Sequence, residues 1–270
     1  MKKHFILPAL IIAISIFLLQ GEIHSQYYEA SLCKKEGNPD LPSLLKKGTI
    51  GELNWWGSMH IGSYICDWST SYLKASGTGP KMPAVKGDAD TDDAMYGYQL
   101  ARESWSCEYS AYSAMDGNTG TAWCEGKKDD GIGEILIVRA DILKPVYIWN
   151  GLGASDSLYK ANNRAQKIRL TVLQAKQASM IIGQYTEGIA YKDITVLGSH
   201  EITLKDLNGW QPLPLPSHKR LAFRSISQHG EPVVKDENST FIAVEILSVY
   251  KGTKYNDTCI SEIGSSGKGK

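Results

Sequence analysis

The feature that most limits the fold of this chain is a series of short runs of β-branched and aromatic residues, each bounded by turn residues. Beyond Tyr96 these runs occupy residues 134–139, 146–149, 167–172, 201–204 and 241–247. In the run 167–172, Ile168, Leu170 and Val172 alternate with polar residues, as half-buried antiparallel strands require. No window of a dozen residues sustains a helical period of 3.6. The pattern therefore predicts an all-β sandwich or barrel.

Two further stretches carry loop and edge signals. The stretch from Gly77 to Asp93 is rich in Gly, Pro and Asp without apolar alternation, which predicts a long loop. After Trp210, alternate positions are occupied by Pro212, Pro214 and Pro216. Because proline cannot donate a ladder hydrogen bond, this segment is predicted to be an extended crossing or an edge strand.

The N-terminus has the pattern of an export signal. Lys2 and Lys3 precede an apolar stretch from Phe5 to Leu19, and a polar stretch then leads to the small residue Ser25. The apolar stretch is short for a bilayer span, and an uncleaved anchor is the alternative. We therefore expect residues 1–25 to be a signal peptide. The mature protein is expected to have no transmembrane segment and to be secreted or held in the cell envelope, in the periplasm or on the outer surface.

The charge balance excludes one class of partner. The chain has 29 Lys plus Arg and 29 Asp plus Glu, so its formal net charge is zero. A chain without excess positive charge has no long-range field to gather nucleic acid. No nucleic-acid partner is expected. The 14 tyrosines, 7 tryptophans and 26 glycines favour short strands, tight turns and aromatic surfaces.

All five cysteines lie beyond the predicted signal peptide: Cys33, Cys66, Cys107, Cys124 and Cys259. Export into an oxidising compartment makes disulfides the expected state of these residues. No C-x-x-C motif occurs, so neither a zinc ribbon nor a thioredoxin-type redox site is indicated. An odd number of cysteines leaves one thiol unpaired or paired between chains.

Composition and strand pattern divide the rest of the chain into three segments. Residues 26–95 are predicted to be an N-terminal extension, which can add strands or loops to the sandwich, residues 96–264 the β domain, and residues 265–270 a flexible tail. The extension holds an aromatic cluster, Trp55, Trp56, Tyr64, Trp68 and Tyr72. Because Trp and Tyr are favoured interface anchors, this cluster motivates the hypothesis of an adhesin-like module that binds a protein partner.

Several ordered strings then indicate a family. They are Met115–Gly126, Gly131–Glu134, Trp149–Gly151, Tyr159–Arg164 and Val249–Ile263. In this order they resemble the discoidin-like (coagulation factor 5/8 type C-like) domains named after the translocation domain of bacterial NAD glycohydrolases, a group described as an NADase-type glycan-binding domain. The resemblance covers residues 96–264. It implies a discoidin-like, galactose-binding-like jelly-roll β-sandwich whose loops at one end bind the ligand.

The resemblance also implies a calcium site at the turn that begins with Asp116. Related galactose-binding-like modules often hold Ca²⁺ through this turn and a glutamate on the last strand, which maps here to Asp116, Asn118, Thr121 and Glu262. Calcium prefers six to eight hard oxygen ligands, and such a turn can supply several of them. The alternative is a purely structural turn, with Trp123 buried in the core. No cofactor is required for the predicted function, and calcium would be structural.

A polar and aromatic constellation is the candidate ligand site. Sugar recognition uses a flat ring for the C–H face of the sugar, with planar amides and a guanidinium for its hydroxyl groups. The candidate residues are Asn150, Tyr159, Asn162, Asn163, Arg164, Lys254 and Tyr255. Alternatively, the asparagines only stabilise turns and Arg164 pairs with Glu134 or Asp156. Glu134 itself is expected to be structural, at an exposed strand edge or bonded to the 162–164 turn.

The resemblance places Cys124 and Cys259 at the same end of the sandwich, so a disulfide between them is expected. Such a bridge would stabilise the fold by roughly 3–5 kcal/mol in the chain-entropy model. The second expected pair is Cys66 with Cys107, which would leave Cys33 free.

No catalytic residue is assigned. The sequence contains no H-E-x-x-H zinc motif and no G-x-S-x-G nucleophile elbow. A hydrolase whose site assembles only in three dimensions is the remaining enzymatic alternative. The leading hypothesis is an exported, non-catalytic carbohydrate-binding module. Its rivals are the adhesin-like module and an accessory domain that targets a separately encoded toxin or enzyme.

Overall fold

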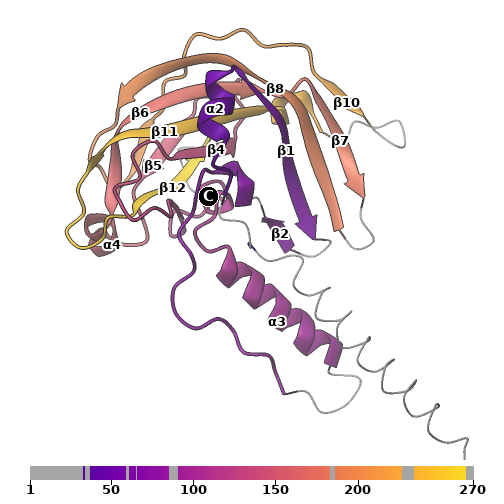
Figure 1. Ribbon diagram of the computed structural model, residues 1–270, viewed down its shortest axis with the longest axis vertical. Coiled ribbons are helices and arrows are strands. Elements are labelled where there is room, and N and C mark those ends of the chain that lie inside the picture. Colours follow the sequence, from indigo (N-terminus) through magenta and orange to yellow (C-terminus); the bar gives the residue numbers. More distant parts are fainter. Residues whose placement is uncertain are drawn as a thin grey trace, which may run out of the picture.

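The computed structural model describes residues 33, 37–58, 61–64, 66–84, 91–182, 186–226 and 234–265. The predicted signal peptide and most of the predicted tail lie outside these residues. The strand pattern of the sequence becomes a β-sandwich with short helices at its margins, so the predicted fold class is confirmed (Figure 1). The helical segments outside the sheets include α2 (Leu41–Lys46), α4 (Asp156–Ala161), η1 (Cys66–Trp68), η2 (Ala111–Ala114) and η3 (Asp236–Asn238).

A long antiparallel ribbon forms the spine of the fold. β6 (Asn163–Gln174) and β7 (Gln177–Ile182) follow each other with only two residues between them, and both pair with β8 (Thr186–Thr203). The alternation of Ile168, Leu170 and Val172 places these three side chains in the core. The register shifts between Val172 and Leu173, a local irregularity that lets the ribbon bend.

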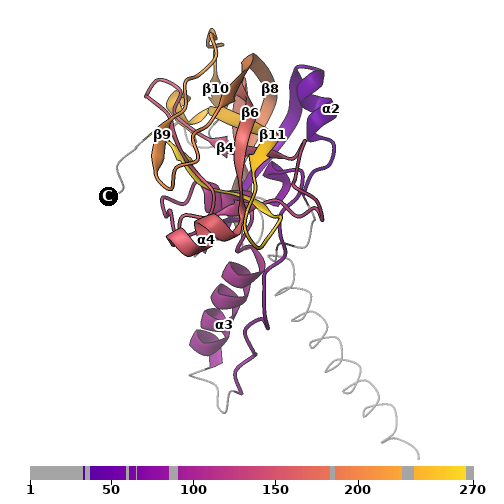
Figure 2. The same ribbon diagram turned by 90° about the vertical axis from the view of Figure 1, so that its left-hand side faces the viewer.

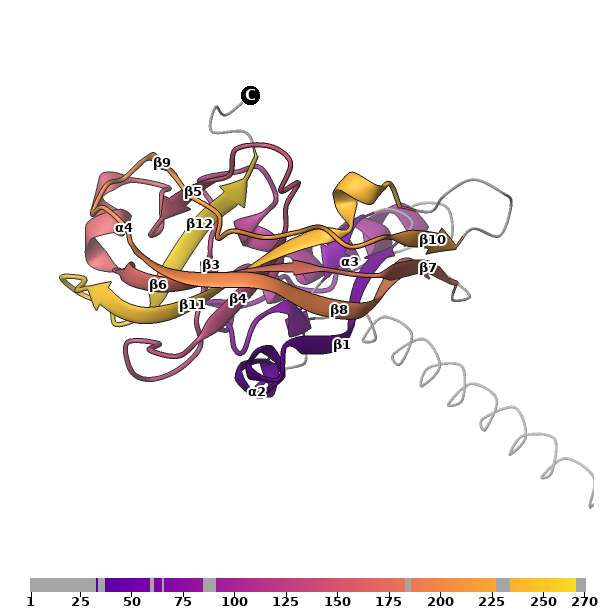
Figure 3. The ribbon, with the colours of Figure 1, turned by 90° about the horizontal axis from the view of Figure 1, so that it is seen from above.

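Two layers of the sandwich are connected to this ribbon through β6. In the first, β11 (Thr240–Tyr250) pairs with β6 on one side and with β4 (Ile135–Arg139) on the other. In the second, β12 (Thr258–Gly264) pairs with β3 (Trp123–Cys124) and β5 (Tyr147–Asn150), and β5 pairs with β9 (Trp210–Pro212). Figure 3 places β12, β5, β9 and α4 together on one side of β6 and β11. A short parallel contact, Thr258 with Asn163 and Cys259 with Arg164, joins the layers.

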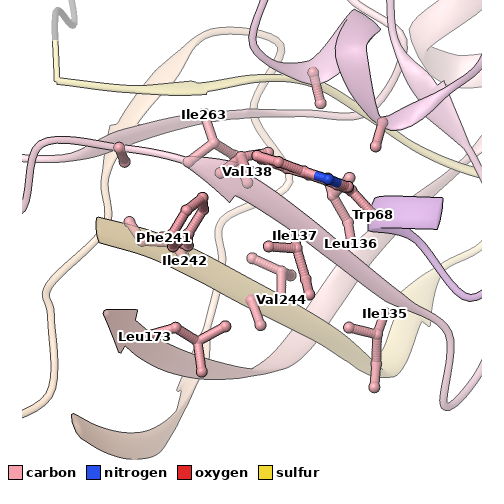
Figure 4. Packing of buried hydrophobic residues seen from close by; sticks show 14 of the residues in the cluster. Trp68, Ile135, Leu136, Ile137, Val138, Leu173, Phe241, Ile242, Val244 and Ile263 are labelled. Carbon is pink, nitrogen blue, oxygen red and sulfur yellow. The ribbon is translucent and has the colours of Figure 1, made fainter. Parts of the chain in front are cut away.

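Several aromatic rings meet in the buried core of the sandwich. The centroid of the Phe241 ring lies 5.4 Å from that of Trp68 and 5.0 Å from that of Tyr191, in edge-to-face arrangements. Aliphatic side chains from β4, β6, β11 and β12 surround these rings (Figure 4). Trp68 is fully buried, and its indole N–H donates to the carbonyl oxygen of Asn54 at 3.1 Å.

The N-terminal extension contributes to this same core. β1 (Thr49–Ser58) pairs antiparallel with the first half of β8 and with the short β2 (Ile61–Tyr64). The side chains of Leu41, Ile50 and Leu53 are fully buried. The extension therefore adds strands to the sheet, and no separation between it and the β domain occurs at residue 96.

A helix occupies the last residues of the expected loop, which ended at Asp93, and the first residues of the predicted β domain. α3 (Thr91–Ser106) projects away from the sandwich in Figures 1 and 2. The sequence has no apolar stripe here, which fits a helix that does not lie along the core. Among the described side chains of α3, Glu103 alone is fully buried and the others are exposed or half-buried. The predicted absence of a helix was wrong for this segment.

β10 (Arg224–Ile226) is a short strand that pairs in parallel with β7.

Two disulfides link the described cysteines. Cys124 is joined to Cys259, the pair that the resemblance implied. Cys107 is joined to Cys33, so the expected Cys66–Cys107 pair was wrong and Cys33 is not free. The Cα atoms of Cys33 and Cys107 lie 5.3 Å apart, inside the range that a disulfide spans. The structure brings Cys33 to the end of α3, where the Tyr72 hydroxyl also donates to the Cys33 carbonyl oxygen at 3.0 Å.

Among the described helices, we find none with the length and apolarity that a membrane crossing needs. The described disulfides are typical of a domain that matures in an oxidising compartment.

Candidate functional site

The turn after Met115 is built as the sequence predicted and is closed by the last strand. Gly117 has a φ of 80°, a conformation that a glycine adopts without strain. The Asp116 carboxylate accepts from the Asn118 backbone N–H at 2.8 Å and from the Thr121 hydroxyl at 2.8 Å. Glu262 on β12 accepts from the Gly117 N–H at 2.9 Å. The four residues implied as calcium ligands therefore lie together.

The carboxyl groups of Asp116 and Glu262 face the same turn, where Glu262 is buried and Asp116 is half-buried. Burial, reinforced by the neighbouring Asp116, raises the pKa of Glu262 to about 8. Burial also raises the pKa of Asp116. Both carboxyl groups therefore hold a proton more readily than free acids do, and a bound cation would instead stabilise their charged forms.

The donor set of this turn fits calcium only with help from the backbone. Among the described residues, no group of three or more His, Cys, Asp or Glu side chains is placed to hold a metal ion. Asn118 Oδ1 accepts from the Gly120 N–H at 2.9 Å, and the Thr121 hydroxyl donates to the Asn118 carbonyl oxygen at 2.7 Å. The turn thus offers two carboxylates and several neutral oxygens to a hard cation.

The predicted ligand residue Arg164 is buried and lies at the centre of a polar lattice that also includes the exposed Asp206. Its guanidinium forms two hydrogen bonds to the Asp206 carboxylate, from Nη2 at 2.7 Å and from Nε at 3.0 Å. Its Nη1 donates to the carbonyl oxygens of Asn162 and Lys251 at 3.0 and 2.9 Å. The Tyr159 hydroxyl donates to the same Asp206 at 2.7 Å, and the guanidinium carbon lies 5.1 Å from the centroid of the Tyr159 ring.

The contacts in this lattice shift the pKa values of Asp206 and Tyr159. Hydrogen bonding to the Arg164 guanidinium lowers the pKa of Asp206. Burial, together with the nearby Asp206 carboxylate, raises the pKa of Tyr159 well above its usual value. Gly151 completes the packing, because a Cβ at this position would lie 2.6 Å from Arg164 Cγ and 2.7 Å from Tyr159 Cε2. Arg164 therefore pairs with neither Glu134 nor Asp156, the partners considered from the sequence.

The three predicted asparagines are also used inside the fold. Asn150 is fully buried and clamps Ala165, donating to its carbonyl oxygen at 2.7 Å and accepting from its N–H at 3.0 Å. Asn163, also fully buried, accepts from the Gly252 N–H at 2.7 Å. Asn162 donates to the Leu158 carbonyl oxygen at 2.9 Å. Their amides hold loops in place and are not presented to solvent.

The lattice fixes three segments at one end of the sandwich, which we call the loop end: α4, residues 204–209 and residues 251–257. The backbone N–H groups of Lys254 and Tyr255 donate to the Ala161 carbonyl oxygen at 3.0 and 2.8 Å. Both side chains are exposed, with the Lys254 ammonium 4.7 Å from the centroid of the Tyr255 ring. Of the seven predicted ligand residues, only these two are exposed.

A second buried cluster borders the loop end. The Glu134 carboxylate is buried, accepts from the hydroxyls of Thr70 and Ser71, and pairs with the Lys127 ammonium at 2.6 Å. Both predicted positions of Glu134 were therefore wrong: it lies neither at an exposed strand edge nor against the 162–164 turn. Glu125 is fully buried and accepts from the backbone N–H of Thr258 at 3.1 Å. Burial raises its pKa to about 7.

Three functional candidates were missed from the sequence. Asp206 is the partner of Arg164, but it stands far from Arg164 in the sequence, and nothing local marks it. Trp149 and Trp210 form an edge-to-face pair on β5 and β9, with ring centroids 5.8 Å apart. The only available signal for this pair was their position next to turns, in the Trp149–Gly151 string and before the proline series.

The aromatic cluster of the extension is mostly internal where its side chains are described. Trp68 is fully buried and Tyr72 nearly so, and Trp55 is half-buried with the Arg139 guanidinium 4.2 Å from its ring centroid. The side chains of Trp56 and Tyr64 lie outside the described ones. These positions give the adhesin-like hypothesis no exposed aromatic anchor among the described side chains.

The described histidines are bonded to backbone groups. His200 Nε2 lies 2.9 Å from the Pro214 carbonyl oxygen, and His218 Nδ1 lies 2.7 Å from that of Pro216. In the part of the chain that the structure describes, neither imidazole is hydrogen-bonded to a hydroxyl or thiol that it could activate. His60 and His229 lie outside the described residues.

The fold and its loop end define the class of this protein, a disulfide-bonded β-sandwich module. A family model described as the NAD glycohydrolase translocation F5/8 type C domain matches residues 89–265. The chain belongs to this family, as the sequence resemblance indicated. The match begins seven residues before the predicted boundary at residue 96, within the region that leads into α3.

Comparisons with individual proteins give no information on function beyond the family match. No curated protein matches the chain. One solved structure that matches is the cryo-electron microscopy structure of arabinofuranosyltransferase AftD from Mycobacteria, at 16% identity and a TM-score of 0.28. The match covers 58% of this chain and 9% of that one. A similarity at this level carries no argument about function.

Proposed function

We propose that this protein is an exported, non-catalytic module that binds a glycan at or outside the cell envelope. The observation that carries the proposal is the loop end, where the hydrogen bonds of the buried Arg164 and Tyr159 to Asp206 fix three segments in one arrangement. A surface held in place before binding loses little conformational entropy when a ligand arrives. The family description, which names a translocation domain and not an enzyme, supports the non-catalytic part.

The residues of this site divide into support and contact. Arg164, Tyr159 and the three buried asparagines support the loops, since their polar atoms already have partners within the fold. Contact with the ligand falls to exposed groups such as Lys254 and Tyr255. A tyrosine ring and an ammonium group can address the C–H face and the hydroxyls of a sugar.

A glycan array followed by isothermal titration of its strongest ligands tests the proposal. We expect binding by the wild type and at least about tenfold weaker binding by the Tyr255→Ala variant. Tyr96→Ala is a matched control, because both tyrosines are 40% exposed and Tyr96 lies on α3, away from the loop end. Absence of binding to every glycan, with and without calcium, would contradict the proposal.

A second candidate function is favoured by the family description. A domain named for translocation of an NAD glycohydrolase suggests an accessory module that delivers a separately encoded enzyme. Capture of a co-expressed candidate enzyme by the purified chain, in the absence of any glycan, would favour this function over the first.

We also propose that the Asp116 turn holds a structural calcium ion. Asp116 and Glu262 would supply the carboxylates, and oxygens of Asn118 and Thr121 the neutral ligands, so that the ion would tie the turn to β12. The raised pKa values of both acids fit this proposal, because two neighbouring carboxyl groups with little water around them favour either a proton or a cation.

Thermal unfolding with CaCl₂ and with EDTA tests the calcium site. We expect calcium to raise the melting temperature, and to raise it more at pH 8 than at pH 6, because protons compete with the ion for these carboxylates. The Asp116→Asn variant should lose the response, whereas Glu237→Gln, at an exposed glutamate on η3, should keep it. An identical melting temperature in CaCl₂ and EDTA at both pH values would refute the site.

A further inference from the structure

The outer face of the second layer carries a row of aromatic side chains. Along β5, Ile148 and Asn150 point inward and are fully buried, so Tyr147 and Trp149 point outward, where they are half-buried. Trp210 on β9 is the direct neighbour of Trp149 in the sheet register. Tyr147, Trp149 and Trp210 therefore share one face, and we call them the aromatic strip.

The two indoles of the strip are held in position by neighbouring groups. Trp149 Nε1 donates to Asn208 Oδ1 at 3.0 Å, and Asn208 Nδ2 donates to Asp156 Oδ1 at 2.7 Å. A Cβ at Gly153 would lie 2.4 Å from Trp149 Nε1, so the backbone of this loop passes against the indole edge. Trp210 contacts Trp149 at an interplanar angle of 84°. The rings are thus oriented before any ligand binds.

No cationic group of the described residues lies over the indoles of the aromatic strip. Such groups lie instead over the rings of Trp55, Tyr159 and Tyr255. β9 is an edge strand, because its described pairing is with β5 alone. Trp149 and Trp210 are half-buried, so part of each side chain remains exposed to the solvent.

The polar groups beside the strip indicate what kind of ligand it fits. Asn208 and Asp156 border the Trp149 indole, and Glu262 is its register neighbour on β12. Asp156 Oδ2 accepts no hydrogen bond from the residues that the structure describes. An amide and a carboxylate bond sugar hydroxyls well, but they give no attraction to an anionic sugar.

We propose that the aromatic strip is the primary sugar-stacking surface of this module, and that Trp149, Trp210, Asn208 and Asp156 select an uncharged pyranose. The proposal rests on the proposed function and deepens it. The strip adjoins the loop end through Asn208 and α4, so a longer glycan lying on the strip would also reach the loop end. The pyranose C–H face stacks on an indole, and its hydroxyls bond to Asn208 and Asp156.

Titration of the full chain with two neutral and two acidic sugars tests this assignment. The probes are galactose, N-acetylglucosamine, glucuronate and N-acetylneuraminate, with binding measured by calorimetry and by tryptophan fluorescence. We expect at least one neutral sugar to bind and to shift the fluorescence, with both acidic sugars binding at least about tenfold more weakly. Trp149→Ala and Trp210→Ala should each weaken binding by at least about tenfold and reduce the fluorescence shift.

Two further variants separate the loss of binding from the loss of fold. Trp105→Phe is the matched control: Trp105 is a half-buried tryptophan on α3 whose indole donates to the Ser76 carbonyl oxygen, and its replacement should leave sugar affinity unchanged. If a Trp→Ala variant unfolds, Asn208→Ala tests the same surface, because it frees the Trp149 indole and removes the amide without removing a ring. It should weaken binding while the melting temperature stays close to that of the wild type.

The other possible results distinguish the aromatic strip, the ligand class and the glycan-binding function from one another. Neutral-sugar binding that persists in the Trp149, Trp210 and Asn208 variants would overturn the strip and leave the glycan-binding function intact. Preferential binding of an acidic sugar would overturn the ligand class. If none of the four sugars binds and a glycan array is also blank, the proposed function falls together with this assignment. If the array alone gives ligands, the same variants decide the strip on the strongest of them.

Discussion

At the scale of single residues, the acids of this protein differ by their neighbours. Asp206 faces the Arg164 guanidinium, and that contact lowers its pKa. Glu262 and Glu125 are buried without a cation of their own, and burial raises their pKa values to about 8 and about 7. The same type of side chain therefore favours the charged form in one place and the protonated form in another.

The raised pKa of Glu262 predicts how stability depends on pH. Between the unfolded value of 4.5 and the folded value of about 8, the native state holds a proton that the unfolded state has released. Its contribution to the free energy of unfolding is therefore full below pH 4.5 and falls as pH rises through that window, by at most about 1.4 kcal/mol per pH unit. Glu125 adds a smaller loss that ends near pH 7.

Denaturant unfolding of the calcium-free protein at several pH values from 5 to about 8.5 measures this loss. The Glu262→Gln variant should have a flatter dependence, because the amide cannot lose a proton. Glu237→Gln, an exposed position, should keep the wild-type slope. Parallel curves for Glu262→Gln and the wild type would show that this carboxyl does not titrate as its surroundings require.

The Arg164 lattice predicts that a lysine cannot replace its arginine. An ammonium group can bond Asp206 but cannot also reach the carbonyl oxygens of Asn162 and Lys251 in the same fixed geometry. We expect Arg164→Lys to lower the free energy of unfolding by about 1–3 kcal/mol. Arg224→Lys, at an exposed arginine on β10, should change it by less than about 0.5 kcal/mol. Equal stability of the two variants would mean that the lattice is not held by the guanidinium.

At the scale of elements, the two disulfides restrain different parts of the fold. Cys124–Cys259 joins neighbouring strands β3 and β12, beside the buried Glu125, and both cysteines are buried. Cys33–Cys107 instead ties the start of the described chain to the end of α3. Loss of the first bridge should therefore disturb the sandwich itself, and loss of the second only its attachment to α3.

Serine variants of each cysteine pair test this difference. Replacing both Cys124 and Cys259, which are separated by 135 residues in sequence, should cost about 3–5 kcal/mol and should weaken glycan binding. Replacing Cys33 and Cys107 should also lower the melting temperature but should leave glycan affinity unchanged. Peptide mapping of the unreduced protein checks the pairing directly, and a Cys66–Cys107 peptide would contradict the arrangement described above.

At the scale of the whole molecule, the first strand of the N-terminal extension and the ligand surfaces occupy different sides. β1 pairs with the first half of β8, whereas α4, β5 and β9 lie together on another side of the sandwich (Figure 3). β1 and α2 complete the core on their side, and Thr70 and Ser71 of the extension reach the Glu134 cluster beside the loop end. Family membership by itself does not include this arrangement, because the family match begins only at residue 89.

Truncation measures what the extension contributes. A chain that begins at residue 89 keeps all of the matched domain but loses β1, Trp68 and the buried side chains of Leu41, Ile50 and Leu53. Because removal of even one large core side chain costs about 3–5 kcal/mol, we expect this chain not to fold cooperatively. A chain that begins at Cys33 should unfold with a cooperative transition like that of the full chain. Cooperative melting of the shorter chain would show that the β domain is independent.

The sequence by itself determined the strand pattern, the sandwich, the family and the Cys124–Cys259 pair. These depend on local alternation of residues and on ordered motifs, which can be read without knowing what lies beside them. The exposure of each candidate side chain was decided only by the tertiary structure. Arg164 is bonded to Asp206, which is 42 positions away in the sequence, and Cys107 is joined to Cys33, which is 74 positions away. Trp149 and Trp210 are neighbours on two paired strands at the edge of the sheet.

The physical reason is that a polar or aromatic side chain has no role until its neighbours are known. A guanidinium, an amide or a ring that the fold already satisfies becomes part of the support, and the same group left open to solvent can bind a ligand. That choice is made by contacts between distant segments, which local sequence does not encode.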